Sequence, residues 1–228
     1  MAAPIALVGG DEFRRYCGEM DQEIMAATGK NSARVVVLPT AAVNGPVKAA
    51  HDGVTHFSAL GGNGQPLMIL DREQANDVEM VQRLAGADVI YFTGGNPNHL
   101  LETLQDSRLL DAIGKAREEG AILAGSSAGA MVMGSVMRRP RADEWVTGLG
   151  IAPGICVLSH HERSNPAEVA PLIEEHLSDS LVVFGIDAQT ACLGLPGEWK
   201  VIGHGKATVY RRGGWRVYQS GETINQAA

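Results

Sequence analysis

Short runs of β-branched and aliphatic residues alternate with helical stretches from Ile5 to the neighbourhood of Ile186, and this alternation constrains the fold more than any other feature. A parallel strand needs a crossover back to the same edge of its sheet, which a helix usually supplies. The pattern therefore predicts an α/β fold with a mostly parallel open sheet and helices on both faces. The strands expected here are residues 5–8, 35–38, 67–70, 88–92, 121–124 and 155–158.

The pattern changes near the C-terminus, where strands follow one another without helices between them. The strands expected there are residues 182–186, 191–195, 200–202, 208–211 and 215–218. Gly213-Gly214 suits a hairpin turn before the last of them, so we expect C-terminal antiparallel strands. The sequence has no repeat and no linker rich in Pro or Ser, and we expect residues 1–228 to form a single domain.

Composition argues against several classes of protein. The chain has 26 acidic and 19 basic residues among 228, a formal net charge of −7, which disfavours a nucleic-acid partner. The longest apolar stretch, residues 121–137, is interrupted by Ser and Gly and is shorter than the roughly 20 residues that a membrane span needs. The N-terminus lacks the basic and apolar regions of a secretion signal. We therefore expect a cytoplasmic protein with no membrane span.

The three cysteines, Cys17, Cys156 and Cys192, lie far apart in the sequence and form no C-x-x-C pair. This spacing is unlike that of a disulfide framework or a zinc site. We expect all three to be thiols in the core.

Residues 125–129 read Gly-Ser-Ser-Ala-Gly and fit the G-x-S-x-G pattern of a nucleophile elbow. The motif lies between an expected strand and a run of small residues that can be helical, which is the context an elbow requires. In that context Ser127 stands at a helix N-terminus, where N–H groups and the dipole stabilise negative charge. A Gly-Ser loop before a helix could equally hold a phosphate, so the motif alone leaves catalysis at roughly even odds.

A serine nucleophile needs a base, and the base needs an orienting carboxylate. His160 and His161 follow an expected strand, and strand ends are where sites form in open α/β sheets. Asp143 and Glu144 are the acids between Ser127 and these histidines. Taken singly, each acid also fits a solvated loop and His161 fits the core. The order Ser, acid, His is the feature that favours a triad.

Two glycine-rich loops follow expected strands. Gly94-Gly95 precedes Asn96, a candidate N-cap for a helix, and the Gly95 N–H is well placed by sequence to donate to an oxyanion. The same residues also fit an ordinary strand-to-helix turn. Residues 9–13 read Gly-Gly-Asp-Glu-Phe, the signature of diguanylate cyclases. In that family the signature belongs to a hairpin in mid-domain, whereas here it follows the first strand, so we interpret it as coincidence.

Four blocks in order resemble one family more specifically than any single motif does. They are Tyr-Phe-Thr-Gly-Gly-Asn at 91–96, Gly-Ser-Ser-Ala-Gly-Ala at 125–130, Gly-Leu-Gly at 148–150 followed by His160, and Gly-Ile-Asp at 185–187 followed by Thr-Ala at 190–191. These blocks resemble those of the peptidase E and cyanophycinase family of serine peptidases, peptidase family S51. The resemblance extends from the first strand to about Gly205.

The resemblance implies a flavodoxin-like fold similar to class I glutamine amidotransferases, with Ser in place of their Cys. It also implies hydrolysis of peptide bonds by a Ser-His-acid mechanism. Ser127 then resembles the nucleophile, His160 the base, and the N–H groups of Gly95 and Ala128 the oxyanion hole. His161 takes the position that an aromatic residue holds in the family.

The triad acid is expected near Asp143 or Glu144, with a slight preference for Glu144. Asp187 is the fallback, although its block fits a structural or substrate-binding role better. Gly94 and Asn96 are further candidates for substrate binding. No metal or organic cofactor is expected, because residues 160–162 are adjacent in the chain and their side chains would point to opposite sides of a strand.

The substrate expected from these features is a short peptide. Cyanophycinases carry Asp-Gln before the histidine and several Arg soon after it, whereas this chain has Leu158-Ser159 before His160 and no Arg between Arg163 and Arg211. A cyanophycinase proper is therefore an alternative that these departures disfavour. A catalytically inactive amidotransferase-like domain that binds a ligand is also compatible with the sequence, and a glutamine amide hydrolase is the least favoured function. A homodimer is the one assembly we consider.

Overall fold

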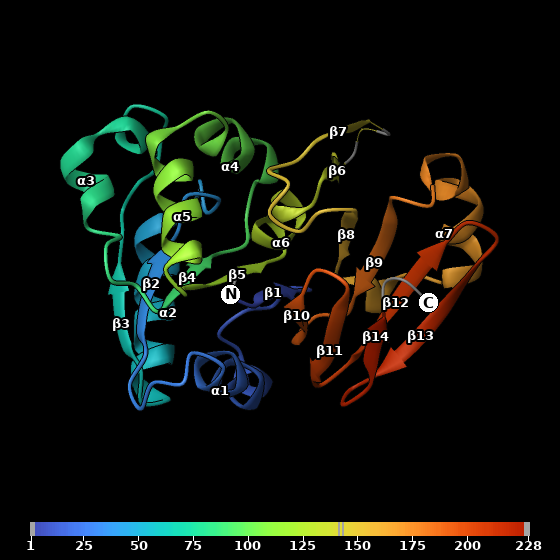
Figure 1. Ribbon diagram of the computed structural model, residues 1–228, viewed down its shortest axis with the longest axis horizontal. Coiled ribbons are helices and arrows are strands. Elements are labelled where there is room, and N and C mark those ends of the chain that lie inside the picture. Colours follow the sequence, from blue (N-terminus) through green and yellow to red (C-terminus); the bar gives the residue numbers. More distant parts are fainter. Residues whose placement is uncertain (1–2, 141, 143, 226–228) are drawn as a thin grey trace.

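The computed structural model describes residues 3–140, 142 and 144–225, and these build two large β-sheets and a two-stranded one, with helices around them (Figure 1). The larger sheet has eight strands in the order β14-β11-β10-β1-β5-β4-β2-β3. Five of them form one parallel block: β1 (Ile5–Val8), β5 (Ile122–Ser126), β4 (Val89–Phe92), β2 (Arg34–Leu38) and β3 (Asn63–Pro66). The predicted mostly parallel α/β sheet is confirmed.

Antiparallel strands complete the larger sheet on the far side of β1. They are β10 (Thr190–Leu195), β11 (Glu198–Gly203) and β14 (Thr223–Asn225). A second sheet has the order β13-β12-β9-β8 and is built from β8 (Ile155–Ser159), β9 (Val182–Ile186), β12 (Lys206–Arg211) and β13 (Gly214–Gln219). The predicted C-terminal antiparallel strands are thus confirmed, and β8 and β9 pair in parallel.

Helices cover both faces of the larger sheet, because alternate strand residues point to opposite sides. On one face Val35 and Val37 share a core with Met20 and Phe57 of α1 (Gly18–Ala26) and α2 (Pro46–Ala59). The other face carries α3 (Val78–Gln82), α4 (Pro97–Leu104), α5 (Arg108–Glu118) and α6 (Ala128–Met133). The four single-turn 3-10 helices are Arg15–Cys17, Gln74–Asn76, His161–Arg163 and Glu174–His176.

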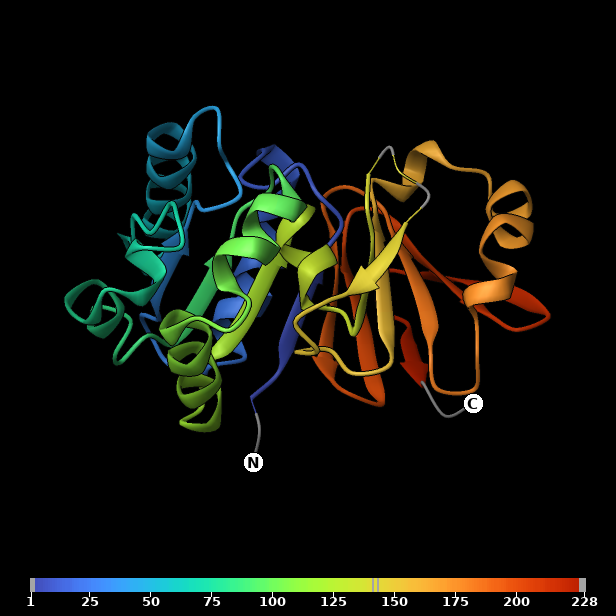
Figure 2. The ribbon, with the colours of Figure 1, turned by 90° about the horizontal axis from the view of Figure 1, so that it is seen from above.

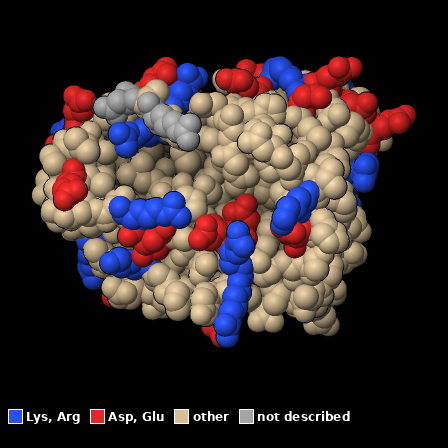
Figure 3. All heavy atoms as spheres, turned by 180° about the vertical axis from the view of Figure 1, so that it is seen from behind, with Lys and Arg blue, Asp and Glu red and all other residues tan. Residues whose placement is uncertain are grey.

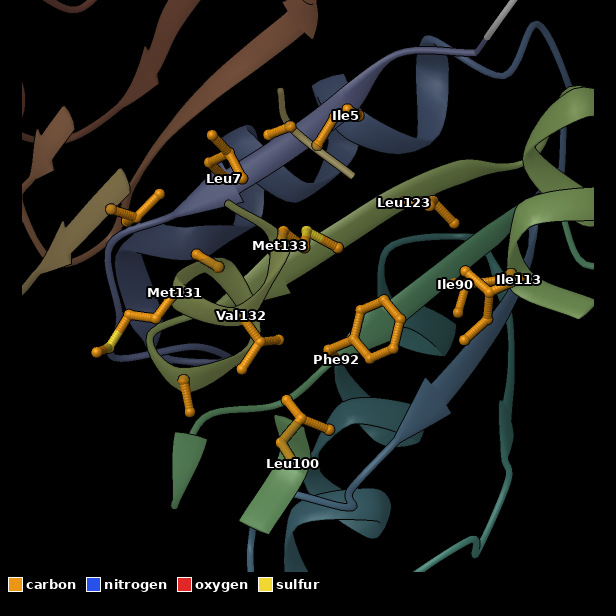
Figure 4. Close-up of a cluster of buried hydrophobic side chains, with 14 of the residues drawn as sticks. Ile5, Leu7, Ile90, Phe92, Leu100, Ile113, Leu123, Met131, Val132 and Met133 are labelled. Carbon is orange, nitrogen blue, oxygen red and sulfur yellow. The ribbon is translucent and has the colours of Figure 1, made fainter. Parts of the chain in front are cut away.

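The second face has the larger core, part of which Figure 4 shows. Phe92 of β4 and Leu123 of β5 lie between the strands and the helices, among residues of α4, α5 and α6. Met131, Val132 and Met133 extend this core from α6 toward the second sheet. Burial of this apolar surface fixes the position of α6, whose first residue follows Ser127.

The second sheet packs one face on this same core and the other face on α7 (Pro166–Ile173), which Figure 2 shows on the outer side of the molecule. A two-stranded hairpin, β6 (Val136–Arg138) and β7 (Trp145–Thr147), leaves the end of α6 and returns toward β8. Trp145 of this hairpin stacks on His176 at a ring distance of 4.1 Å.

The cap expected at Asn96 is present, and α5 begins with a similar cap. Asn96 accepts hydrogen bonds from the backbone N–H groups of Asn98 and His99 at the start of α4. Ser107 accepts one from Leu110 at the start of α5.

One predicted strand is wrong. Residues 67–70 form no strand, and the preceding residues, Asn63–Pro66, pair with β2 instead. Leu67 donates a last hydrogen bond to Val37, and Ile69 then turns back to bond the carbonyl of Leu67. Both side chains are fully buried. Their apolar character therefore reflects burial in an irregular segment rather than an extended conformation.

None of the described helices is both long and apolar enough to cross a bilayer. Figure 3 shows acidic and basic side chains interspersed on one face of the molecule.

Candidate active site

Ser127 lies in a sharp turn between β5 and α6, with φ 48° and ψ −107°. Its N–H donates to the carbonyl of Val8 at 2.9 Å, and its own carbonyl accepts from Met131, which starts the helix. The turn needs small neighbours. A Cβ on Gly125 would lie 2.5 Å from the backbone of Gly129, and a Cβ on Gly129 would lie 2.6 Å from the carbonyl oxygen of Phe92. The strand, turn and helix that a nucleophile elbow requires are all present.

His160 follows the last residue of β8 in the left-handed conformation, with φ 53° and ψ 42°. Its N–H donates to the carbonyl of Gly9 at 2.8 Å. The imidazole lies directly against Gly10, where a Cβ would be 2.3 Å from Cε1 of the ring. Gly10 has φ 136°, so glycine is required there both for space and for conformation.

The two residues are held by consecutive carbonyls at the end of β1, Val8 for Ser127 and Gly9 for His160. Consecutive carbonyls of an extended chain point to opposite sides, so the two residues approach the end of β1 from either side. Both line a cleft of about 330 Å³ at the carboxyl end of the parallel strands. Ligand sites of open α/β sheets lie at this edge.

His161 is directed away from this cleft. Its Nε2 lies 2.7 Å from the hydroxyl oxygen of Tyr210, and its ring packs against Gly185, where a Cβ would be 2.5 Å away. Burial lowers the pKa of His161. The adjacent histidines therefore have separate surroundings, with His160 in the cleft and His161 in the core between β9 and β12.

The loop after β4 supplies one of the two candidate oxyanion donors. Gly95 has φ 141° and lies against Ala41, whose carbonyl oxygen would be 2.0 Å from a Cβ at this position. The N–H of Gly94 is already used, because it donates to Glu12 Oε1 at 2.7 Å. The N–H groups of Gly95 and Ala128 remain the two candidates, and Gly95 lines the cleft with Ser127.

Asn96 uses its side-chain oxygen to cap α4, at 3.0 and 3.2 Å from the two N–H groups it accepts. It lines a neighbouring hollow with Gly94 and Gly95. A contact with substrate would therefore involve its amide NH₂ group.

The candidate acids have different surroundings. Glu144, beside β7, pairs with Arg139 at 3.0 Å, and its side chain is 55% exposed. Asp143 lies outside the described residues. Asp187 is buried between β9 and β10, accepts a hydrogen bond from the Lys206 N–H at 3.2 Å, and has its pKa raised by burial.

The Nδ1 atom of His160 is buried and has no hydrogen-bond partner among the described residues. The structure therefore brings Ser127 and His160 to one cleft and pairs neither Glu144 nor Asp187 with the histidine. Glu162 is a further acid near His160. Burial alone would raise the pKa of Glu162, but hydrogen bonds from the backbone, including that of Ala188, and the charges of His160 and Arg163 lower it.

Sequence reasoning missed Glu12, which lines the cleft and contacts both loops that carry the site. It belongs to the Gly-Gly-Asp-Glu-Phe segment that we interpreted as coincidence. The signal that could have found it is its position directly after the strand that neighbours β5 in the sheet.

Cysteine chemistry has no support in this structure. Cys17, Cys156 and Cys192 are free and buried, as predicted. Burial raises the pKa of Cys17 and of Cys156 to about 12 and also raises that of Cys192. Among the described residues no group of three or more His, Cys, Asp and Glu side chains could hold a metal ion.

The conformation of Ser127 generates a prediction about stability. Glycine adopts a positive φ without strain, whereas alanine does not, and a residue in such a conformation costs on the order of 1–3 kcal/mol. We expect Ser127→Gly to be more stable to unfolding than Ser127→Ala by about 1 kcal/mol, part of the relief being offset by the flexibility of glycine in the unfolded chain. Chemical denaturation of both variants measures this difference. Because both lack the hydroxyl, an equal or higher stability of the alanine variant would show that the turn is unstrained.

Comparison with known proteins identifies the family of this chain. Residues 5–194 match peptidase family S51. Among curated proteins, the cyanophycinase of Nostoc sp. is 26% identical over 218 residues, which is 90% of this chain and 72% of that protein. The cyanophycinase of Synechococcus elongatus is 35% identical over 155 residues, 63% of this chain and 48% of that protein.

Solved structures show the same fold. A peptidase from an acI-B1 Actinobacterium superposes with a TM-score of 0.85 and 26% identity, covering 99% of this chain and 97% of that one. A structure from Listeria monocytogenes, at 18% identity and a TM-score of 0.63 over 92% of this chain and 99% of that one, shares the fold. The match over most of the chain shows that this protein belongs to peptidase family S51, a family of serine peptidases.

Proposed function

We propose that this chain hydrolyses short peptides through an acyl-enzyme on Ser127, with His160 as the general base. The observation that carries the proposal is the pair of hydrogen bonds from Ser127 and His160 to the consecutive carbonyls of Val8 and Gly9. They place a hydroxyl at a helix N-terminus and an imidazole in one cleft. A nucleophile and a base in one cleft are the minimum that acyl transfer requires.

In the first half of the proposed reaction, Ser127 Oγ attacks the peptide carbonyl carbon and its proton passes to His160. The carbonyl oxygen becomes an oxyanion that accepts hydrogen bonds from the N–H groups of Gly95 and Ala128. When the C–N bond breaks, His160 returns the proton to the leaving amine and an ester on Ser127 remains. Water, deprotonated by His160, then attacks the ester carbonyl carbon. The bond from this carbon to Ser127 Oγ breaks, His160 returns the proton to Oγ, and the acid is released.

The triad acid is proposed to come from the segment between β6 and β7. Arg139 and Pro140 of this segment line a hollow together with Ser159 and His161, the chain neighbours of His160. The order Ser, acid, His along the chain supports Glu144 or Asp143 over Asp187. In the described structure Glu144 pairs with Arg139, so acting on His160 requires the carboxylate to change partner.

The proposed substrate is a short peptide, and the volume of the cleft supports this size. Cyanophycinase activity is the second candidate, favoured by the names of the curated relatives. The absence of Arg between Arg163 and Arg211 in the sequence weighs against it. The proposed location is the cytoplasm, where three free buried cysteines remain reduced.

The test of the proposal combines a fluorophosphonate probe with a peptide-library digest. We expect the probe to label the wild-type protein and not Ser127→Ala, and kcat for a cleaved peptide to fall by at least ~10³ in that variant. Ser58→Ala, on the exposed end of α2, is the matched control and should react like wild type.

The same assays test the chemistry around the nucleophile. Activity should survive EDTA and iodoacetamide, since the proposed reaction uses neither a metal nor a thiolate. Labelling of Ser127→Ala, or loss of peptide cleavage on adding chelator, would contradict the proposal.

The acid is tested by amide substitutions. The three variants are Glu144→Gln, Asp143→Asn and Asp187→Asn. The variant that replaces the triad acid should retain the fold but lower kcat by up to ~10⁴, because the histidine loses its orienting partner. Glu119→Gln, at the exposed end of α5, is the control for loss of one negative charge. Wild-type turnover in both the Glu144 and the Asp143 variants would move the assignment to Asp187.

A further inference from the structure

The carboxylate of Glu12 connects the two loops that carry the proposed nucleophile and oxyanion donor. Its Oε1 accepts the N–H of Gly94 at 2.7 Å, and its Oε2 accepts the hydroxyl of Ser126 at 2.7 Å. Gly94 precedes Gly95, and Ser126 precedes Ser127. The half-buried side chain of Glu12 thus accepts hydrogen bonds from the residue before Gly95 and from the residue before Ser127. The Gly95 N–H and the Ser127 hydroxyl must act on the same substrate carbonyl.

We propose that Glu12 is a positioning residue that aligns the Gly95 N–H with Ser127 Oγ, an inference that rests on the proposed peptidase function. The alignment needs a fixed contact, because Gly94 and Gly95 are two consecutive glycines with wide conformational freedom. On one side the loop is anchored by the hydrogen bond from Asn96 N–H to Ala41. On the other side it is anchored by Glu12.

The packing around Gly94 agrees with this role. A Cβ at Gly94 would lie 2.9 Å from Glu12 Oε1 and 3.4 Å from the Cβ of Ser127. The backbone of Gly94 is therefore enclosed between the carboxylate and the nucleophile. Any movement of this loop would change the distance between the Gly95 N–H and the oxygen that develops negative charge.

Each oxygen of Glu12 accepts a hydrogen bond from one of the two loops, so both oxygens hold the loops in place. A negative charge beside a developing oxyanion is unfavourable in itself. The charge disfavours the reaction, so the benefit of this residue lies in the geometry that its two hydrogen bonds impose. Preorganised donors are the main source of oxyanion stabilisation.

The test uses the fluorophosphonate probe, which measures acylation geometry without knowledge of the natural substrate. In this reaction a bond forms between Ser127 Oγ and phosphorus, the P–F bond breaks, fluoride leaves, and the hydroxyl proton passes to His160. The phosphonyl oxygen occupies the oxyanion position. The rate of bond formation at saturation, kinact, and the probe concentration at half-saturation, KI, are measured separately.

For Glu12→Ala we expect kinact to fall by about 10- to 100-fold, the scale of a misplaced catalytic group, with KI within about twofold of wild type. Glu12→Gln should lose less, because its amide oxygen still accepts from Gly94 and its NH₂ can donate to Ser126. Adding Ser126→Ala to Glu12→Gln should cost less than the sum of the two single effects, since both act through one contact. Glu19→Gln, an exposed acid of α1, is the matched control and should react like wild type.

A merely structural role would lower the melting temperature of the Glu12 variants and leave kinact of the folded protein unchanged. That result overturns the inference. A change in KI with no change in kinact overturns it as well. If Glu12→Ala does not fold, an unchanged kinact in Glu12→Gln and in Ser126→Ala overturns it equally. Failure of the wild-type protein to react with the probe would instead overturn the proposed function, so the two outcomes are distinguishable.

Discussion

The hydrogen bonds that Ser127 and His160 make to the end of β1 are the constraint on which the rest of the site depends. β1 is the strand of the parallel block that borders the antiparallel extension. The carbonyl of Val8 accepts from Ser127 after β5, and that of Gly9 accepts from His160 after β8 of the second sheet. Gly9 and Gly10 allow these segments to approach the end of β1 closely, because neither has a side chain. A Cβ at Gly9 would lie 2.1 Å from the carbonyl oxygen of Asp187, and one at Gly10 would meet the ring of His160.

The second sheet explains why the two adjacent histidines differ. β8 is an edge strand of that sheet, and the hydrogen bond from the His160 N–H to Gly9 joins its end to the end of β1. His161 anchors the segment by its contacts with Tyr210 and Gly185, while the left-handed conformation of His160 turns its ring toward Gly10. The strained residues of the site, Ser127 and His160, are thus supported by well-packed neighbours on both sides, as backbone strain at functional sites requires.

Much of this arrangement could be predicted from local sequence. Apolar runs located most strands, the polar residue Asn96 marked a helix start, and the spacing of Gly125 and Gly129 indicated the turn at Ser127. Each of these signals reflects a local requirement, namely burial of a strand, capping of a helix or space in a tight turn, that involves only a few neighbouring residues. The expected strand at residues 67–70 failed because the buried Leu67 and Ile69 satisfy the core without pairing.

Contacts between distant segments could not be predicted in this way. Glu12 is separated from Gly94 by 82 positions and from Ser126 by 114, so no periodicity or spacing connects them. The short hairpin of β6 and β7, in which the candidate acid Glu144 directly precedes β7, also shows no hydrophobic pattern in the sequence. Its strands have three residues each, too few for alternation to show.

We propose that the end of β1, together with Glu12, holds a nucleophile, a base and an oxyanion donor around one reacting atom. A crystal structure of the protein after treatment with the fluorophosphonate tests it most directly. The account predicts a covalent adduct on Ser127 Oγ, with the phosphonyl oxygen about 2.7–3.1 Å from the N–H groups of Gly95 and Ala128 and with the His160 ring beside Oγ. An adduct on another residue, or a phosphonyl oxygen directed away from Gly95, would contradict it.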